Sequence, residues 1–119
     1  MKIKIKQTAL QVILEASRTA YSNGREFMGF LRAEDGVITE IILPPNPVFT
    51  RTSASTRLDM KPLDSSIIGS VHSHPGKPFP SAADRRFFSN FGRVHFIVGY
   101  PFTPDDIWIM GGGELEIVK

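Results

Sequence analysis

The sequence predicts an α/β domain built on a mixed β-sheet flanked by helices. The chain has 119 residues, of which 41% are hydrophobic and 22% charged, values typical of one globular domain. Apolar residues recur with a helical period near the N-terminus, and several apolar runs of strand length lie between glycines and prolines. We therefore expect a single domain over residues 1–119.

The first part of the chain predicts a short edge strand, a long helix and a hairpin. Lys2–Lys6 alternates Lys and Ile, which favours an edge strand. Thr8–Gln11 resembles a capping box, and Asn23-Gly24 would end the helix that it opens. Two strands joined by a tight turn are expected next, over Phe27–Leu31 and Val37–Leu43.

The second part predicts a further helix and five strands. The helix is expected over Ser81–Phe91. The strands are expected near Ser55–Leu58 and over Ile67–His74, Val94–Tyr100, Ile107–Met110 and Glu114–Val118. Val94–Tyr100 is apolar and bounded by Gly and Pro, which indicates a central strand. The last two strands flank Gly111–Gly113, which suggests a final hairpin.

Composition excludes several classes of function. The chain has no cysteine, which excludes disulfides, thiolate zinc sites, iron–sulfur clusters and the zinc nucleotide deaminases with a Cys-x-x-Cys pair. No apolar run has the length of a membrane span, so we expect a cytoplasmic protein without a membrane partner. The net charge of +2 is carried by scattered residues. Nucleic-acid binding rests on this mildly basic charge alone, and no nucleic-acid partner is expected.

The segment Val71–Pro75 carries the clearest chemical signal. Side chains at i and i+2 of a strand point to the same face, so His72 and His74 project together and can share one metal ion. The Pro-Gly that follows ends the strand, at the edge where open sheets often hold their sites. The alternative is two unrelated polar residues on a solvent-facing strand, but the apolar start of this strand argues against it.

Asp84 is the candidate third ligand. In one interpretation Ser81 and Asp84 form a helix capping box, in which Asp84 only stabilises the first turn. Asp84 also shares a helix face with three phenylalanines, and an inward carboxylate is costly unless it is paired or metal-bound. Three protein ligands would leave the fourth zinc position for water, as in catalytic sites. His95 lies mid-strand and is expected to be a core histidine.

Hydrolysis of an amide also needs an acid/base outside the metal ligands. The candidate carboxylates are Glu15, Glu26, Glu34, Asp35, Glu40, Asp59 and Asp64. Position favours Glu26, which begins a strand instead of lying on a solvated helix face. Position alone leaves the other carboxylates open.

Glu26, His72-x-His74-Pro75 and Ser81-x-x-Asp84 together resemble the JAMM (MPN-plus) metalloproteases, which include deubiquitinating isopeptidases and small prokaryotic relatives. The order of helix, Glu-x-x-Gly hairpin, His-x-His strand, Ser-x-x-Asp helix and apolar strand extends the likeness over nearly the whole chain. The resemblance implies a cytidine-deaminase-like MPN domain with a curved mixed sheet. Six residues separate His74 from Ser81, one fewer than is usual in the family.

The resemblance implies a role for each residue. His72, His74 and Asp84 would bind one Zn²⁺ per chain. Glu26 would act as general acid/base, activating the zinc-bound water and then protonating the leaving amine, and Ser81 would stabilise the oxyanion.

The implied substrate is the amide bond after the C-terminal Gly-Gly tail of a ubiquitin-like protein, cleaved by an isopeptidase. Two alternatives stay open: a peptidase that trims C-terminal extensions from a ubiquitin-like sulfur-carrier protein, and a non-catalytic MPN-type scaffold. Relatives often pair with a second MPN domain, which leaves a homodimer open as an alternative to a monomer. The chain has little room for the insertions with which eukaryotic deubiquitinases grip ubiquitin, so cleavage specific for one polyubiquitin linkage is not expected.

Overall fold

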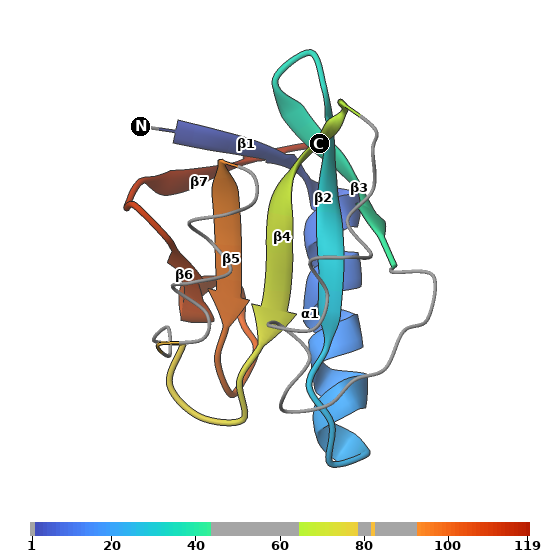
Figure 1. Cartoon of the computed structure of the whole chain (residues 1–119), viewed down its shortest axis with the longest axis vertical. Coiled ribbons are helices and arrows are strands. Elements are labelled where there is room, and N and C mark those ends of the chain that lie inside the picture. Colours follow the sequence, from blue (N-terminus) through green and yellow to red (C-terminus); the bar gives the residue numbers. More distant parts are fainter. Residues whose placement is uncertain (1, 44–64, 79–81, 83–92) are drawn as a thin grey trace.

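The computed structural model describes residues 2–43, 65–78, 82 and 93–119. Within them one α-helix packs against a curved seven-stranded sheet of order β6-β5-β4-β2-β3-β1-β7 (Figure 1). The elements are β1 (Lys2–Lys6), α1 (Gln7–Ser22), β2 (Met28–Glu34), β3 (Val37–Ile42), β4 (Ile67–Ser73), β5 (Val94–Val98), a short 3₁₀ helix (Pro104–Asp106), β6 (Ile107–Ile109) and β7 (Glu114–Val118). The predicted α/β class with a mixed, curved sheet is confirmed.

The directions of the central strands bring distant segments to one edge of the sheet. β4 and β5 are parallel, and β2 is antiparallel to β4. The carboxyl ends of β4 and β5 therefore lie beside the start of β2, at the lower end of Figure 1. Because strand β4 ends at Ser73, this edge carries the His-x-His segment.

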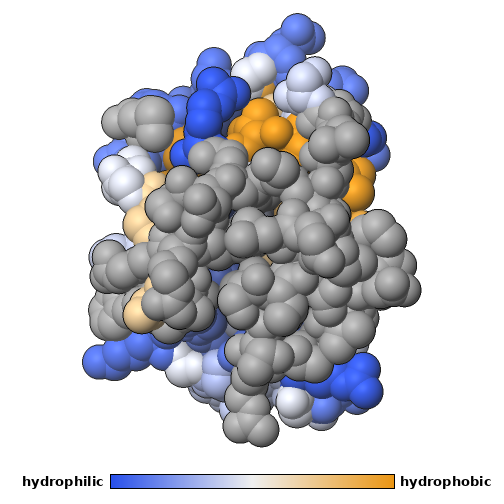
Figure 2. All heavy atoms as spheres, in the orientation of Figure 1, coloured by the Kyte–Doolittle hydropathy of each residue, from blue (hydrophilic) through white to orange (hydrophobic). Residues whose placement is uncertain are grey.

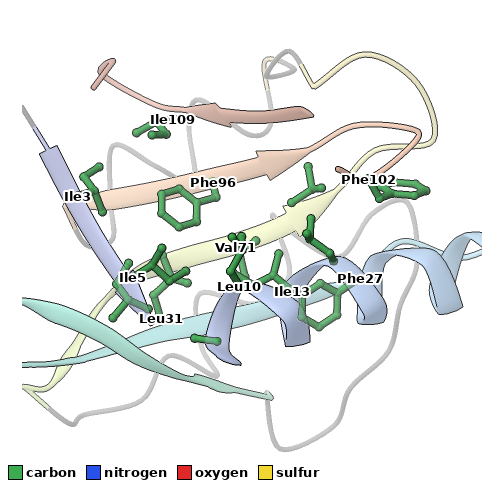
Figure 3. Close-up of a cluster of buried hydrophobic side chains, with 14 of the residues drawn as sticks. Ile3, Ile5, Leu10, Ile13, Phe27, Leu31, Val71, Phe96, Phe102 and Ile109 are labelled. Atoms are coloured by element: carbon green, nitrogen blue, oxygen red, sulfur yellow. The ribbon is translucent and has the colours of Figure 1, made fainter. Parts of the chain in front are cut away.

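The main core lies between α1 and the sheet (Figure 3). The helix contributes an apolar face that includes Leu10, Ile13 and Leu14. The sheet contributes alternate residues from several strands, among them Ile3, Ile5, Leu31, Val71, Phe96, Val98 and Ile109, and Phe27 joins them from just before β2. Each large apolar side chain buried in this way stabilises the fold by roughly 1.5–3 kcal/mol.

The helix begins differently from the prediction and ends where it was expected. Gln7 follows β1 directly, and the N-cap residue Lys6 makes no side-chain capping bond. The predicted capping box at Thr8 is therefore wrong, because Thr8 already lies inside the first turn and packing of the apolar face holds the helix. At the other end Gly24 takes the left-handed conformation with φ of +68°, which glycine adopts without strain.

β1 is an interior strand, so the predicted edge strand is wrong. It pairs in parallel with β3 on one side and with β7 on the other. Ile3 and Ile5 are buried in the core, whereas Lys2 and Lys4 are exposed. The Lys/Ile alternation thus reflects one buried and one solvated face of a paired strand.

The predicted hairpin of the last two strands is also wrong. β6 pairs with β5, and β7 pairs with β1, so the two strands lie at opposite ends of the strand order. Leu115 of β7 lies opposite Ile3 and packs against the core. The connection contains Gly111–Gly113, all with positive φ, a conformation that glycine allows and that redirects the chain between the two strands.

The remaining predicted elements differ in their bounds or lie elsewhere. β2 begins one residue later than predicted and continues to Glu34, while the strands at 37–42, 67–73 and 94–98 match the expectations closely. The predicted strand near Ser55–Leu58 and the predicted helix Ser81–Phe91 lie outside the described residues. Among the described helices, none has the length and apolar character needed to cross a membrane. Where Figure 2 colours the surface, hydrophilic side chains gather at the two ends of the view.

Close contact between β4 and β5 depends on Gly69. A Cβ atom added to Gly69 would lie 1.5 Å from the carbonyl oxygen of Val94. We expect Gly69→Ala to lower the free energy of unfolding by about 3 kcal/mol or more, because backbone must move to relieve the overlap. Urea unfolding measures the effect. Gly76→Ala is the matched control, since an added Cβ there meets no atom within 4 Å, and an equal loss in both variants would contradict this account.

Candidate metal and catalytic site

The two histidines at the end of β4 lie side by side. Their ring centroids are 5.2 Å apart, with an angle of 26° between the ring planes. His72 is the last but one residue of β4, and His74 is the first residue after the strand. The prediction that both side chains project together is confirmed. Imidazole nitrogens are preferred zinc ligands, so this pair suits a shared metal ion.

His72 is buried in the sheet, whereas His74 lies nearer the surface. The side chain of His72 is only 5% exposed. In the strand register it lies opposite Met28 of β2 and beside Ile97 of β5, which are both buried. The backbone N–H of His74 donates a hydrogen bond to the carbonyl oxygen of Val98 at 2.8 Å. Both neighbouring strands therefore limit the movement of the histidine pair.

Ser73, between the two histidines, fixes the chain next to Glu26. The N–H of Phe27 donates to Ser73 Oγ at 2.8 Å, and the N–H of Ser73 donates to the Phe27 carbonyl at 2.9 Å. The β2–β4 ladder ends at the pair Met28–His72, and these two bonds extend the contact by one residue to Phe27 and Ser73. The residue next to Glu26 thus contacts the residue between the two histidines, although 46 positions separate Phe27 from Ser73.

Glu26 also lines a cleft next to the segment that follows the two histidines. This cleft has a volume of about 260 Å³, and its wall includes Glu26 and Pro75, the residue that follows His74. Glu26 is half-buried and lies two residues before the start of β2. Glu26 therefore lies at the edge of the sheet where β4 ends, and it is partly accessible to solvent.

The third histidine has a different environment. His95 is 3% exposed within β5, and its Nδ1 shares a hydrogen bond of 2.8 Å with Ser70 Oγ, which is also buried. Ser70 lies opposite His95 in the parallel ladder and two residues before His72. The prediction of a core histidine is confirmed, and Ser70 is its polar partner.

The other two predicted site residues, Ser81 and Asp84, lie outside the described residues. Within the described part of the chain, no group of three His, Asp or Glu side chains is arranged to hold a metal. The structure thus brings Glu26, His72 and His74 to one edge of the sheet, and the third ligand remains the sequence prediction Asp84.

Sequence reasoning missed the role of Ser73. No role was expected for Ser73, yet it is 2% exposed and binds Phe27, the residue just before β2. The alternation of side chains along a strand could have predicted its environment, because it turns Ser73 away from the face of the histidines and toward the helix side of the sheet. A small hydroxyl residue there can accept a hydrogen bond from a neighbouring strand.

Comparison with known proteins assigns this fold and its paired histidines to a family. The chain belongs to the family of prokaryotic homologues of the JAB domain, whose model matches residues 7–110. The resemblance read from the sequence is thereby confirmed.

Individual relatives agree with this assignment. A probable metalloprotease from Haloferax volcanii is 40% identical over 115 residues, which cover 87% of this chain and 70% of the relative. A JAB1/MPN domain protein from Archaeoglobus fulgidus has a similar structure, with a TM-score of 0.72 and 31% identity over 98% of this chain and 99% of the other.

Two further solved structures are similar. One is described as a JAMM metalloprotease-like zinc site in the proteasome and signalosome, with a TM-score of 0.72 and 31% identity over 100% of both chains. A protein from Desulfitobacterium hafniense is 19% identical with a TM-score of 0.59, covering 100% of this chain and 94% of the other, and it supports the fold alone.

Removal of the Ser73 hydroxyl should loosen the start of β2. In Ser73→Ala the buried N–H of Phe27 loses its acceptor, so we expect the free energy of unfolding to fall by about 1–3 kcal/mol. Amide exchange at Phe27 should accelerate, and both effects can be followed by chemical denaturation and hydrogen exchange. Ser22→Ala removes an exposed hydroxyl bonded to the Arg18 carbonyl and serves as control. Wild-type exchange at Phe27 in Ser73→Ala would refute the proposed contact.

Proposed function

We propose that the protein is a zinc-dependent peptidase that hydrolyses the amide bond after the C-terminal Gly-Gly tail of a ubiquitin-like protein. The observation that carries the proposal is the pairing of Phe27 with Ser73, which holds Glu26 at the same edge as His72 and His74. Membership of the JAB family and the 40% identical probable metalloprotease support the hydrolytic part. The tail specificity rests on the resemblance of the motif to JAMM isopeptidases.

The donor set fits zinc. Two imidazoles lie within stacking distance at the end of β4, and neutral imidazole is a preferred zinc ligand. We propose that His72, His74 and Asp84 hold one Zn²⁺ per chain. Zinc bound by three protein ligands supplies Lewis acidity and lowers the pKa of water in its coordination shell toward neutrality.

Glu26 is the proposed general acid/base. It is a carboxylate near the end of β4 and is not one of the three proposed ligands, so it is assigned the proton transfer. It accepts a proton as water adds to the carbonyl carbon of the scissile amide. The same proton then goes to the amine nitrogen as the carbon–nitrogen bond breaks. Ser81 is the proposed hydrogen-bond donor to the oxygen that becomes negatively charged.

Two leaving groups are compatible with this chemistry. An isopeptidase releases the ε-amine of a lysine, whereas a trimming peptidase releases the α-amine of a C-terminal extension. Neither the family nor the histidine geometry distinguishes them, since the bond broken is an amide in both.

Glu26→Gln should separate catalysis from folding. We expect unchanged unfolding and zinc content with a kcat about 10²- to 10⁴-fold lower, the usual contribution of a general acid/base. The zinc-loaded protein is incubated with a ubiquitin fusion that carries a C-terminal extension, and loss of the extension is measured by mass spectrometry. Glu34→Gln removes an exposed carboxylate from the far end of β2 and should keep full activity. Near-normal turnover by Glu26→Gln would show that the base is misassigned.

Zinc content tests the ligand assignment. Protein purified without chelator should contain one zinc per chain, and His72→Ala, His74→Ala or Asp84→Ala should weaken zinc binding by more than about 100-fold, beyond the usual effect of outer-shell residues. Elemental analysis and metal titration provide the measurement. His95→Gln removes the histidine bonded to Ser70 and should retain zinc once folding is verified. Absence of stoichiometric zinc from the wild type would favour the non-catalytic scaffold.

A further inference from the structure

The cleft beside Glu26 contains a cation that the proposed chemistry does not use. Its walls are formed by Tyr21, Gly24, Arg25, Glu26 and Pro75. These residues come from the end of α1, the turn that follows it and the segment after His74. A group bound in this cleft would therefore lie next to both Arg25 and the proposed acid/base Glu26.

An aromatic cluster gives the cleft a firm wall. The ring of Tyr21 lies 5.0 Å from that of Tyr100 and 5.5 Å from that of Phe102, in a tilted and an edge-on arrangement. Phe102 is 2% exposed, and its carbonyl accepts a hydrogen bond of 2.8 Å from Arg18. Tyr100 N–H in turn donates to the Gly76 carbonyl at 3.0 Å, which ties this cluster to the segment after the histidines.

The backbone at Arg25 is fixed by the end of α1. The N–H of Arg25 donates to the Ala20 carbonyl at 2.8 Å, and the N–H of Gly24 donates to the Tyr21 carbonyl at 3.0 Å. With Gly24 at φ of +68°, this is a Schellman motif. Arg25 therefore starts from a defined position at the cleft, and only its side chain must order when a ligand binds.

The charge of Arg25 is available for a ligand. The described residues contain two ion pairs, Lys2–Glu116 and Arg32–Glu40, and Arg25 takes part in neither. Its side chain is exposed at the cleft. A guanidinium presents parallel N–H donors that match a carboxylate in a bidentate pair, which an ammonium group cannot reproduce.

We propose that this cleft binds the leaving group, and that Arg25 selects a leaving group with a carboxylate next to the released amine. The inference rests on the proposed function: Glu26 returns its proton to the amine nitrogen, so the residue that carries this nitrogen lies beside Glu26 during bond breakage. The carbon–nitrogen bond breaks, the carbonyl carbon gains the oxygen of water, and the released α-amino acid keeps its carboxylate on Arg25.

This arrangement favours a linear C-terminal extension over a lysine conjugate. The α-carboxylate of a single C-terminal residue lies two bonds from the scissile nitrogen, within the same small cleft. The ε-amine of a lysine within a protein has no carboxylate at this distance. The protein is therefore expected to act as a trimming peptidase that removes a terminal residue after Gly-Gly.

The test compares two substrates that differ by one charge. Ubiquitin extended after Gly-Gly by one alanine is prepared as the free acid and as the C-terminal amide, and kcat/KM is measured with zinc-loaded protein. We expect the wild type to prefer the acid by about tenfold, mostly through KM, at the lower end of what a charge-assisted hydrogen bond supplies. Arg25→Gln should bring this ratio close to one, and Arg25→Lys should retain only part of it.

Two further measurements make the result decisive. Arg93→Gln removes the same charge just before β5, at the opposite end of the strand from the histidines, and should keep the tenfold ratio. In Glu26→Gln, whose slowed turnover permits binding measurements, the Kd values of the two substrates should differ by the same factor, and adding Arg25→Gln should abolish the difference. Equal wild-type rates on acid and amide, or an unchanged ratio in Arg25→Gln, would overturn the inference alone. Hydrolysis of neither substrate would overturn the proposed function together with it.

Discussion

The pairing of Phe27 with Ser73 determines where the chemistry can occur. It consists of two hydrogen bonds, one from each backbone N–H, and it joins the residue just before β2 to the last residue of β4. Without it the start of β2 would have no fixed position relative to the histidines, since Glu26 lies outside any regular element. The site is therefore a consequence of strand register, and its accuracy depends on one buried serine.

Because side chains alternate between the two faces of a strand, the end of β4 contributes both to the core and to the histidine pair. On the helix side Phe27 and Val71 are buried in the main core, whereas His72, between Val71 and Ser73, faces the opposite side with Met28 and Ile97. The stability gained by covering one face with α1 thus holds the histidines on the other face. Changes that weaken the core should move the site as well, because packed interiors transmit strain instead of absorbing it.

The sequence predicted those features that depend on local rules. His72 and His74 could be paired because side chains two apart in a strand share a face, and the end of α1 could be placed because Gly24 takes a positive φ. Pairing between distant strands follows no such rule. Alternation in β7 indicated a strand but could not reveal that its partner is β1, and the position of Glu26 depends on a register formed 46 residues further along the chain.

Two neighbouring residues with opposite charges are held by different parts of the fold. The position of Arg25 depends on the Schellman motif at the end of α1, whereas that of Glu26 depends on the pairing of the next residue, Phe27, with β4. In our proposal one side chain selects the leaving group and the other transfers its proton. Because the two anchors are separate, a substitution at Arg25 can alter the choice of leaving group while Glu26 stays aligned with the histidines. A small domain can thus change its substrate at the end of a helix without rebuilding its catalytic edge.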